Sequence, residues 1–194
     1  TPEGFADDPA AVHAFYNMRR AKVRSCQPNA AHVALAALQQ DPRVDVTLVT
    51  QNVDDLHERA GSRDVIHMHG THLVALCAAC DARWPAPDVM QAHDRCACGG
   101  AVRPDVVWFG EVPYHMDRIG TALIEADMFV AIGTSGVVYP AAGLVRVATQ
   151  SGADTLELNL GASERASDFS DARFGVATQV VPAWVNEVLA DPDQ

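Results

Sequence analysis

The chain has 194 residues, of which 48% are hydrophobic, and its 25 acidic and 14 basic residues give a formal net charge of −11. This apolar fraction excludes a disordered chain and suits one domain with a small inserted subdomain. The charge argues against a nucleic-acid partner, because phosphates require a basic face. Residues 1–8 resemble neither a signal nor a transit peptide, and no run of about 18 apolar residues predicts a membrane helix. We therefore expect a cytoplasmic protein.

The first part of the chain alternates helical and extended patterns. Apolar residues at helical spacing predict helices, and β-branched runs predict strands. In chain order these are a helix over 9–25, a helix over 30–40 that begins after the N-cap Asn29, a strand over 44–50, a turn and short helix over 51–60, and a strand over 65–69.

A cysteine-rich stretch, residues 73–104, then interrupts this pattern. Beyond it the order resumes with an apolar core segment over 106–109, a helix over 116–126, a strand over 128–132, a Gly/Ser/Thr loop over 133–136, a helix over 140–150, a strand over 155–160 and a helix over 182–189. Strands that alternate with helices favour an α/β fold with a parallel sheet and helices on both faces.

Four of the five cysteines predict a metal site. Cys77 and Cys80 form one close pair, and Cys96 and Cys98 form a second after fifteen intervening residues. Two such pairs fold back to close a tetrahedron around zinc, and four thiolates leave no open position, so the ion would be structural. The alternative is four unligated thiols. Cys26 lies outside the cluster, and we expect it in the core.

Polar residues follow three strands, at the edge where parallel α/β sheets bind ligands. His67 and His69 share one face of a strand end, and either could be a base or a structural histidine. Asn52 and Asp54 could orient a ligand, or an aspartate there could cap the next helix. The loop over 133–136 could hold a phosphate at a helix N-terminus, although an ordinary capped turn has the same pattern.

The order of these motifs is more specific than any one of them. QNVDDLH, HMHG, the four-cysteine insert, VVWFGE, GTS and ELNL follow one another between residues 15 and 181. This combination resembles the sirtuins, NAD-dependent protein-lysine deacylases, and most of all their class III. The resemblance implies a Rossmann-like NAD-binding domain over 26–71 and 105–194. It also implies a small helical and zinc-ribbon subdomain over 1–25 and 72–104.

The resemblance also assigns roles to individual residues. His69 is implied to be the catalytic base that deprotonates a ribose hydroxyl. NAD⁺, which the family consumes, is implied to contact Gln51, Asn52, Asp54, Gly133, Thr134, Ser135, Asn159 and Ala177. The acylated-lysine peptide is implied to pair as an added strand with Val107, Trp108, Phe109, Gly110 and Glu111. The acyl group passes to ADP-ribose, nicotinamide is released, and the zinc takes no part in the chemistry.

One detail of the first helix bears on the acyl group. Tyr16 and Arg19 are three residues apart and share a helix face. In class III sirtuins such a pair binds the carboxylate of succinyl- or malonyl-lysine, and a guanidinium suits a carboxylate because the two groups pair bidentately. The resemblance thus implies desuccinylase and demalonylase activity besides deacetylation. The alternative is a solvated Arg19 and a core Tyr16.

The sequence departs from the family at its start. The family begins with a strand and a GAGxS loop that binds pyrophosphate, and neither is found in the 194 residues. We expect a fragment of a longer, monomeric enzyme. The alternative is a truncated, noncatalytic module that binds ADP-ribose or acylated peptide.

Overall fold

The structure is a computed structural model, and it describes residues 1–134 and 141–190. The chain packs as two compact units. Unit 1 comprises Thr1–Gln27, Val49–Leu56 and Ile66–Tyr114, and unit 2 comprises Pro28–Leu48, His57–Val65 and the described residues from His115 onward. The predicted division assigned residues 49–56, 66–71 and 105–114 to the larger domain, whereas here they pack with the zinc-ribbon segment in unit 1.

Unit 1 begins with two capped helices. The side chain of Thr1 caps α1 (Pro2–Asp7), and the side chain of Asp8 caps α2 (Pro9–Ser25), which has Pro9 at its first position. Proline is favoured there because the first helical N–H has no partner to lose. Helix α2 has the predicted bounds, and α1 is an addition to the prediction. Cys26 is half-buried at the end of α2, so its predicted place in the core is wrong.

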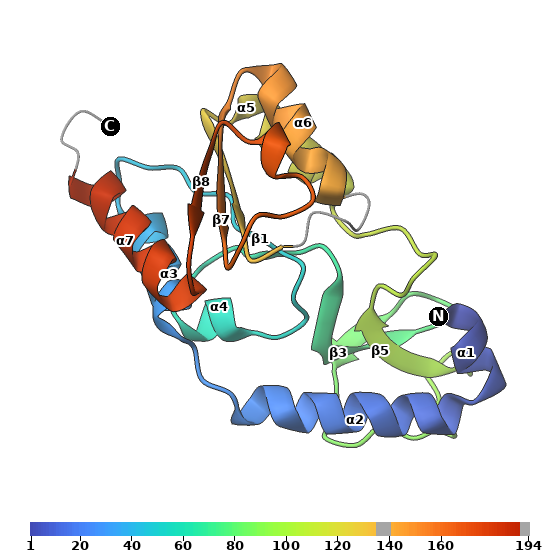
Figure 1. The fold of residues 1–194 in the computed structure, drawn as a ribbon. Coiled ribbons are helices and arrows are strands. Elements are labelled where there is room, and N and C mark those ends of the chain that lie inside the picture. The colour runs from blue at the N-terminus through green and yellow to red at the C-terminus, as the bar shows by residue number, and fades with distance from the viewer. Residues whose placement is uncertain (135–140, 191–194) are drawn as a thin grey trace. The chain divides into compact units, whose positions relative to one another are not determined.

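Unit 1 contains two small sheets. Strands β1 (Val49–Thr50) and β2 (Ile66–His67) are parallel. Strands β3 (Gly70–Cys77), β4 (Arg83–Pro85) and β5 (Val102–Val106) form an antiparallel sheet in the order β4-β3-β5. Helix α2 runs along β3 and β5 (Figure 1). The buried Arg20 of α2 fixes this packing, because its Nε donates to the carbonyl oxygen of His72 on β3 at 2.8 Å.

Unit 2 is a parallel α/β layer. Its elements, with the short α4 at its boundary, are α3 (Ala30–Gln40), α4 (Leu56–Arg59), α5 (Met116–Glu125), β6 (Met128–Ile132), α6 (Ala141–Ser151), β7 (Asp154–Asn159), the 3-10 turn η1 (Ala166–Asp168), β8 (Asp171–Phe174) and α7 (Ala177–Ala190). The strand order is β6-β7-β8, all parallel. Helix α7 lies alongside α3 (Figure 1), and Leu35, Leu158 and Val181 are among the buried residues of this core.

The predicted fold class, an α/β protein with parallel sheets, is confirmed, but several elements differ from their predicted extents. Only Val49 and Thr50 of the expected strand over 44–50 pair with a neighbour. A strand needs a ladder partner, and Val44–Leu48 has none among the residues that the structure describes. Helix α7 begins five residues before the predicted start at Pro182, which it contains. Across the described ranges, no helix is long and apolar enough to cross a membrane.

Candidate functional site

The four clustered cysteines of unit 1 bring their sulfur atoms together. All four Sγ atoms lie within 4.8 Å of one another, with Cys77 and Cys98 at 3.5 Å and Cys80 and Cys96 at 3.8 Å. These sulfurs are too far apart for a disulfide. Tetrahedral zinc with Zn–S bonds of about 2.3 Å separates its sulfurs by about 3.8 Å. The cluster therefore fits one structural zinc ion.

Local backbone geometry favours a thiolate at Cys77. Cys77 ends β3 and is fully buried, and the backbone N–H of Ala79 lowers the pKa of its thiol to about 6. Metal binding requires the deprotonated form. Gly100 lies directly behind the cluster, where a Cβ atom would come within 2.7 Å of the Cys77 sulfur. Glycine is therefore needed here for the second pair of cysteines to approach the first.

His69 lies just beyond β2, in the turn that leads to β3. Its Nδ1 is 3.1 Å from the carbonyl oxygen of Gln51. A carbonyl only accepts hydrogen bonds, so Nδ1 carries the proton and Nε2 keeps its lone pair. This tautomer makes Nε2 the ring atom that can accept a proton. His67, the other predicted candidate, lies within β2 opposite Thr50.

The loop that follows β1 holds three predicted cofactor residues, Gln51, Asn52 and Asp54. The backbone N–H of Asn52 donates to the Thr50 hydroxyl at 3.0 Å, and Asn52 itself is exposed. The Asp54 carboxylate accepts the N–H of Leu56 at 3.0 Å, so it begins α4. Asp54 therefore has the capping role that the sequence left open, and a role toward a ligand stays a prediction.

The glycine of the HMHG motif, Gly70, lets the chain after His69 approach the backbone that leads into the segment over 107–111. Gly70 has φ +73°, and a Cβ there would lie 2.0 Å from the carbonyl oxygen of Asp105, so only glycine fits. The two residues before Gly70 are also bonded to this region, since Val107 N–H donates to His69 O at 3.0 Å and Tyr114 N–H donates to Met68 O at 2.9 Å. The predicted base and the predicted peptide-binding segment therefore lie side by side in unit 1.

Within that segment the two aromatic residues differ sharply. Trp108 is buried, whereas Phe109 is 80% exposed, so the prediction that the core continues through Phe109 is wrong. Val112, just beyond the segment, is 78% exposed. These two apolar side chains are exposed on the stretch that is bonded to His69 through the backbone of Val107. Gly110, at the turn, has φ +93°.

Tyr16 contacts another polar residue of unit 1, His72. The Tyr16 ring packs edge-on against His72 with centroids 5.4 Å apart, and its hydroxyl accepts a hydrogen bond from Trp108 Nε1 at 2.7 Å. Burial raises the pKa of Tyr16, so the hydroxyl is neutral at pH 7. Burial lowers the pKa of His72 to about 4, and the charge of Arg19 adds to this. Arg19 is exposed and has no carboxylate partner within the described part of the chain.

Unit 2 holds the other predicted cofactor residues. Gly133 follows β6 with φ +62°, and Asn159, at the end of β7, donates from Nδ2 to the carbonyl oxygen of Thr134 at 2.8 Å. Thr134 and Asn159 therefore meet at the carboxyl edge of the parallel strands, as predicted for a ligand-binding edge. Ala177 is exposed at the start of α7. The prediction for Ser135 falls outside the described residues.

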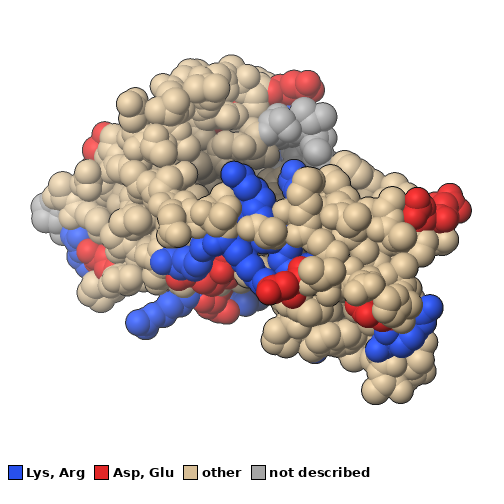
Figure 2. Space-filling model, turned by 90° about the horizontal axis from the view of Figure 1, so that it is seen from below, with Lys and Arg blue, Asp and Glu red and all other residues tan. Residues whose placement is uncertain are grey.

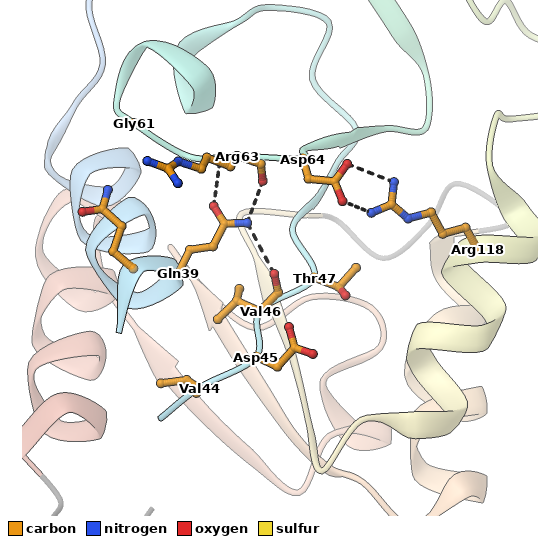
Figure 3. Close-up of a pocket in the computed structure, with 10 residues that line it drawn as sticks. Gln39, Val44, Asp45, Val46, Thr47, Gly61, Arg63, Asp64 and Arg118 are labelled. Atoms are coloured by element: carbon orange, nitrogen blue, oxygen red, sulfur yellow. Dashed lines mark hydrogen bonds and ion pairs between the residues drawn. The ribbon is translucent and has the colours of Figure 1, made fainter. Parts of the chain in front are cut away.

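Unit 2 also has an open hollow of about 620 Å³ that contains none of the predicted site residues (Figure 3). The unpaired segment over 44–47 forms one side. Gln39 joins that segment to Arg63, because its Nε2 donates to Val46 O at 3.4 Å and to Arg63 O at 2.7 Å. Arg118 of α5 forms an ion pair with Asp64 at the rim. The hollow lies along the part of the predicted strand that pairs with no other described strand.

Sequence reasoning missed two buried residues that touch the predicted site, Arg103 and His72. Arg103 lies on β5, and both of its terminal nitrogens bond the carboxylate of Glu111. The strand sequence VRPDVV does not indicate a partner for Arg103, because Glu111 lies beyond the turn that follows the strand. His72, a single histidine on β3, had no sequence signal either.

Fold and site together define a class: an α/β protein with parallel sheets, a four-cysteine cluster that fits zinc, and a histidine whose Nδ1 contacts the Asn/Asp loop. A sequence profile described as the Sir2 family matches residues 1–140. The chain therefore belongs to the Sir2 family, and the resemblance to sirtuins is confirmed.

Individual relatives agree with this assignment. An NAD-dependent protein deacylase of Caulobacter vibrioides is 52% identical over 198 residues, covering 98% of this chain and 82% of the relative. A Salmonella typhimurium protein of the same name is 50% identical over 196 residues, covering 97% and 71%. A solved Sir2 homologue–NAD complex matches with TM-score 0.90 and 38% identity, covering 97% and 75%. A structure of Sir2 bound to acetylated peptide matches with TM-score 0.82 and 26% identity, covering 97% and 82%.

Proposed function

We propose that this chain is an NAD-dependent protein-lysine deacylase that transfers the acyl group of acyl-lysine to ADP-ribose and releases nicotinamide. The observation that carries the proposal is His69, with its Nδ1 proton fixed on Gln51 O and its Nε2 left to accept a proton. The named activity of the relatives supports it, as do the matched complexes with NAD and with acetylated peptide.

The chain's own residues supply positioning and proton transfer in this proposal. NAD⁺, when bound, supplies the ribose that receives the acyl group. In unit 1, Asn52 and Asp54 line the nicotinamide side, and His69 Nε2 takes the proton of a ribose hydroxyl. In unit 2, Gly133, Thr134 and Asn159 hold the phosphates and the second ribose. The zinc bound by the four cysteines is structural, because four thiolates leave no position open for substrate.

We propose that the preferred acyl groups carry a carboxylate, as in succinyl- and malonyl-lysine. Since the Tyr16 hydroxyl accepts the Trp108 indole N–H, its own proton is left to donate to a ligand. Arg19 lies on the same helix face as Tyr16 and supplies a charged, bidentate donor. Acetyl-lysine would still be a substrate in this proposal, but without the ion pair.

The proposed partner is an extended acylated peptide that pairs with the backbone over 107–111. In such pairing the peptide's side chains contribute little to recognition, so peptides of many sequences are suitable substrates. On the face shown in Figure 2, Lys and Arg side chains lie in small groups beside Asp and Glu side chains. This mixed charge supports a protein substrate over nucleic acid. We further propose a cytoplasmic monomer.

The activity is tested on the full-length gene product with succinyl-, malonyl- and acetyl-lysine peptides of one sequence, with and without NAD⁺. We expect NAD-dependent release of nicotinamide and free lysine, and a loss of at least about 100-fold in His69→Ala, because general-base catalysis contributes that much. The His69→Ala protein should still bind zinc and unfold cooperatively. Absence of NAD-dependent release from all three peptides would end the proposal.

The acyl preference is tested with Arg19→Met, for which Arg24→Met is the matched control on the same helix. We expect kcat/KM for succinyl peptide to fall by about 10- to 100-fold, as for loss of a charge-assisted hydrogen bond, with acetyl peptide changed less than about threefold. Arg24 pairs with Asp88 at the surface and should leave both values unchanged. Equal losses on the two peptides would remove the carboxylate proposal and leave the deacylase proposal intact.

The predicted alternative, a noncatalytic module, stays a prediction with its own test. Calorimetry of the 194-residue chain with ADP-ribose and with acyl peptide measures binding without turnover. Binding of either ligand by a full-length protein that is inactive on every peptide would favour the module.

A further inference from the structure

Arg103 makes more contacts with the 107–111 segment than any role in sheet pairing requires. It lies on β5 and is only 8% exposed. Its Nη1 and Nη2 donate to the two carboxylate oxygens of Glu111 at 2.5 and 2.8 Å. Nη2 also donates to the carbonyl oxygen of Val106 at 2.8 Å. One guanidinium therefore holds the residue before the segment and the last residue in it.

Glu111 in turn is hydrogen-bonded to the backbone of Trp108, within the same segment. Its Oε2 accepts the backbone N–H of Trp108 at 2.7 Å, while its own N–H donates to Trp108 O at 2.9 Å. The Arg103 guanidinium holds the pKa of Glu111 below its ordinary value, so the carboxylate is charged at neutral pH. Charge-assisted bonds of this kind are the strongest hydrogen bonds available to a protein, and the bidentate geometry also fixes orientation.

The Trp108 side chain extends the same network to the first helix. The Arg103 guanidinium stacks 3.5 Å from the centroid of the indole ring, which is a close cation–π contact. Locked in this way, the indole directs its N–H to the Tyr16 hydroxyl at 2.7 Å. Tyr16 is the residue proposed above to bind the acyl carboxylate. A continuous chain of contacts thus runs from Arg103 through Trp108 to Tyr16.

We propose that Arg103 is a positioning residue that couples the two halves of substrate recognition: through Glu111 it sets the backbone that pairs with the peptide, and through Trp108 it sets the Tyr16 hydroxyl that selects the acyl group. The inference rests on the proposed deacylase activity. Arg103 touches neither the peptide nor NAD⁺ in this proposal, so it acts only through Glu111 and Trp108. A purely structural ion pair would instead affect stability alone.

The decisive variants are Arg103→Lys and Glu111→Gln, with Arg83→Met as the matched control. Arg103→Lys keeps the positive charge but loses the bidentate guanidinium. Glu111→Gln keeps an acceptor for the Trp108 N–H but loses the negative charge. Arg83 forms an ion pair with the buried Asp105 at 2.9 Å in the same sheet and does not touch the 107–111 segment. Its loss perturbs the sheet without disturbing the coupled network.

We expect KM for succinyl peptide to rise about tenfold in both decisive variants, a change of about 1.4 kcal/mol, while KM for NAD⁺ stays within about twofold. The succinyl-to-acetyl ratio of kcat/KM should fall, because Tyr16 loses its fixed partner. Arg83→Met should lower thermal stability and leave both KM values and this ratio unchanged.

Each result has one meaning. If the unmodified protein deacylates no peptide, the proposed function fails. If it is active, and Arg103→Lys and Glu111→Gln keep their peptide KM and acyl ratio, the coupling role of Arg103 is wrong and the deacylase stands. Equal rises in KM for NAD⁺ and peptide would also overturn it, because they indicate general damage. Should Arg103→Lys fail to bind zinc or to fold, Glu111→Gln alone decides.

Discussion

The two units of this chain have different kinds of interior. Unit 2 packs a continuous apolar cluster, in which Leu35, Leu158 and Val181 are buried between α3, β7 and α7. Unit 1 has a small apolar cluster around Ala75 and Met90. Among the described residues, its buried polar residues are His13, Arg20, Thr50, His72, Arg103 and Asp105, whereas those of unit 2 are Ser62, Thr155 and Glu157.

The two units are therefore stabilised by different kinds of interaction. Apolar burial is non-directional, so unit 2 depends on area and tolerates small shifts. Buried charges and thiolates stabilise only when specific partners are in place, and removing one partner leaves the other uncompensated. Unit 1 therefore gains precise geometry around His69 and the 107–111 segment, and it becomes sensitive to the loss of single groups.

Removal of zinc is expected to have the largest effect and to fall on unit 1. Chelation, or Cys77→Ser, removes the zinc–thiolate bonds that connect the end of β3 to the second cysteine pair. We expect the midpoint of thermal unfolding to fall by more than about 10 °C and amide protection over residues 70–106 to be lost. Protection of β6, β7 and α7 should persist, because their core contains no metal. Hydrogen exchange with and without chelator measures both.

Two outcomes would contradict this picture. One is a Cys77→Ser protein that keeps one zinc per chain and full stability. The other is equal loss of protection in both units, which would mean that the apolar core of unit 2 is not independent of the metal. Cys26→Ser is the matched control, since Cys26 lies outside the cluster and should leave zinc content unchanged.

The same difference explains what the sequence could predict. Helix α3 and strand β6 match their predicted bounds because strong periodicity and an N-cap specify them locally. The four zinc ligands could be predicted from spacing alone. The pairing of Arg103 with Glu111 could not, because it depends on the turn at 108–111 and on the place of β5. The sequence also could not predict that Val44–Leu48 pairs with no described strand, because strand pairing depends on a neighbouring segment as well as on the strand's own residues.

A smaller effect is expected from His72, which is 3% exposed and whose pKa is lowered from 6.5 to about 4. Burial is the main cause, the charges of Arg19 and Arg20 add to it, and that of Asp54 opposes it. The folded protein thus keeps His72 neutral while the unfolded chain takes up a proton below pH 6.5. The stability contributed by neutral His72 is full above pH 6.5 and is lost as pH falls toward 4, by up to about 1.4 kcal/mol per pH unit.

His72→Phe isolates this contribution, because phenylalanine keeps a ring against Tyr16 but cannot titrate. Nδ1 of His72 is buried and has no hydrogen-bond partner among the described residues, so its removal should do little harm at pH 7.5. Denaturant unfolding in a pH series from 7.5 down to below 4 should show the variant losing less stability than the unmodified protein at each step between 6.5 and about 4. The gap should stop growing near pH 4, where the folded histidine itself becomes protonated. Parallel curves over the whole range would mean that His72 is as accessible to protons in unit 1 as in the unfolded chain, and that the polar interior of this unit is wetter than its burial indicates.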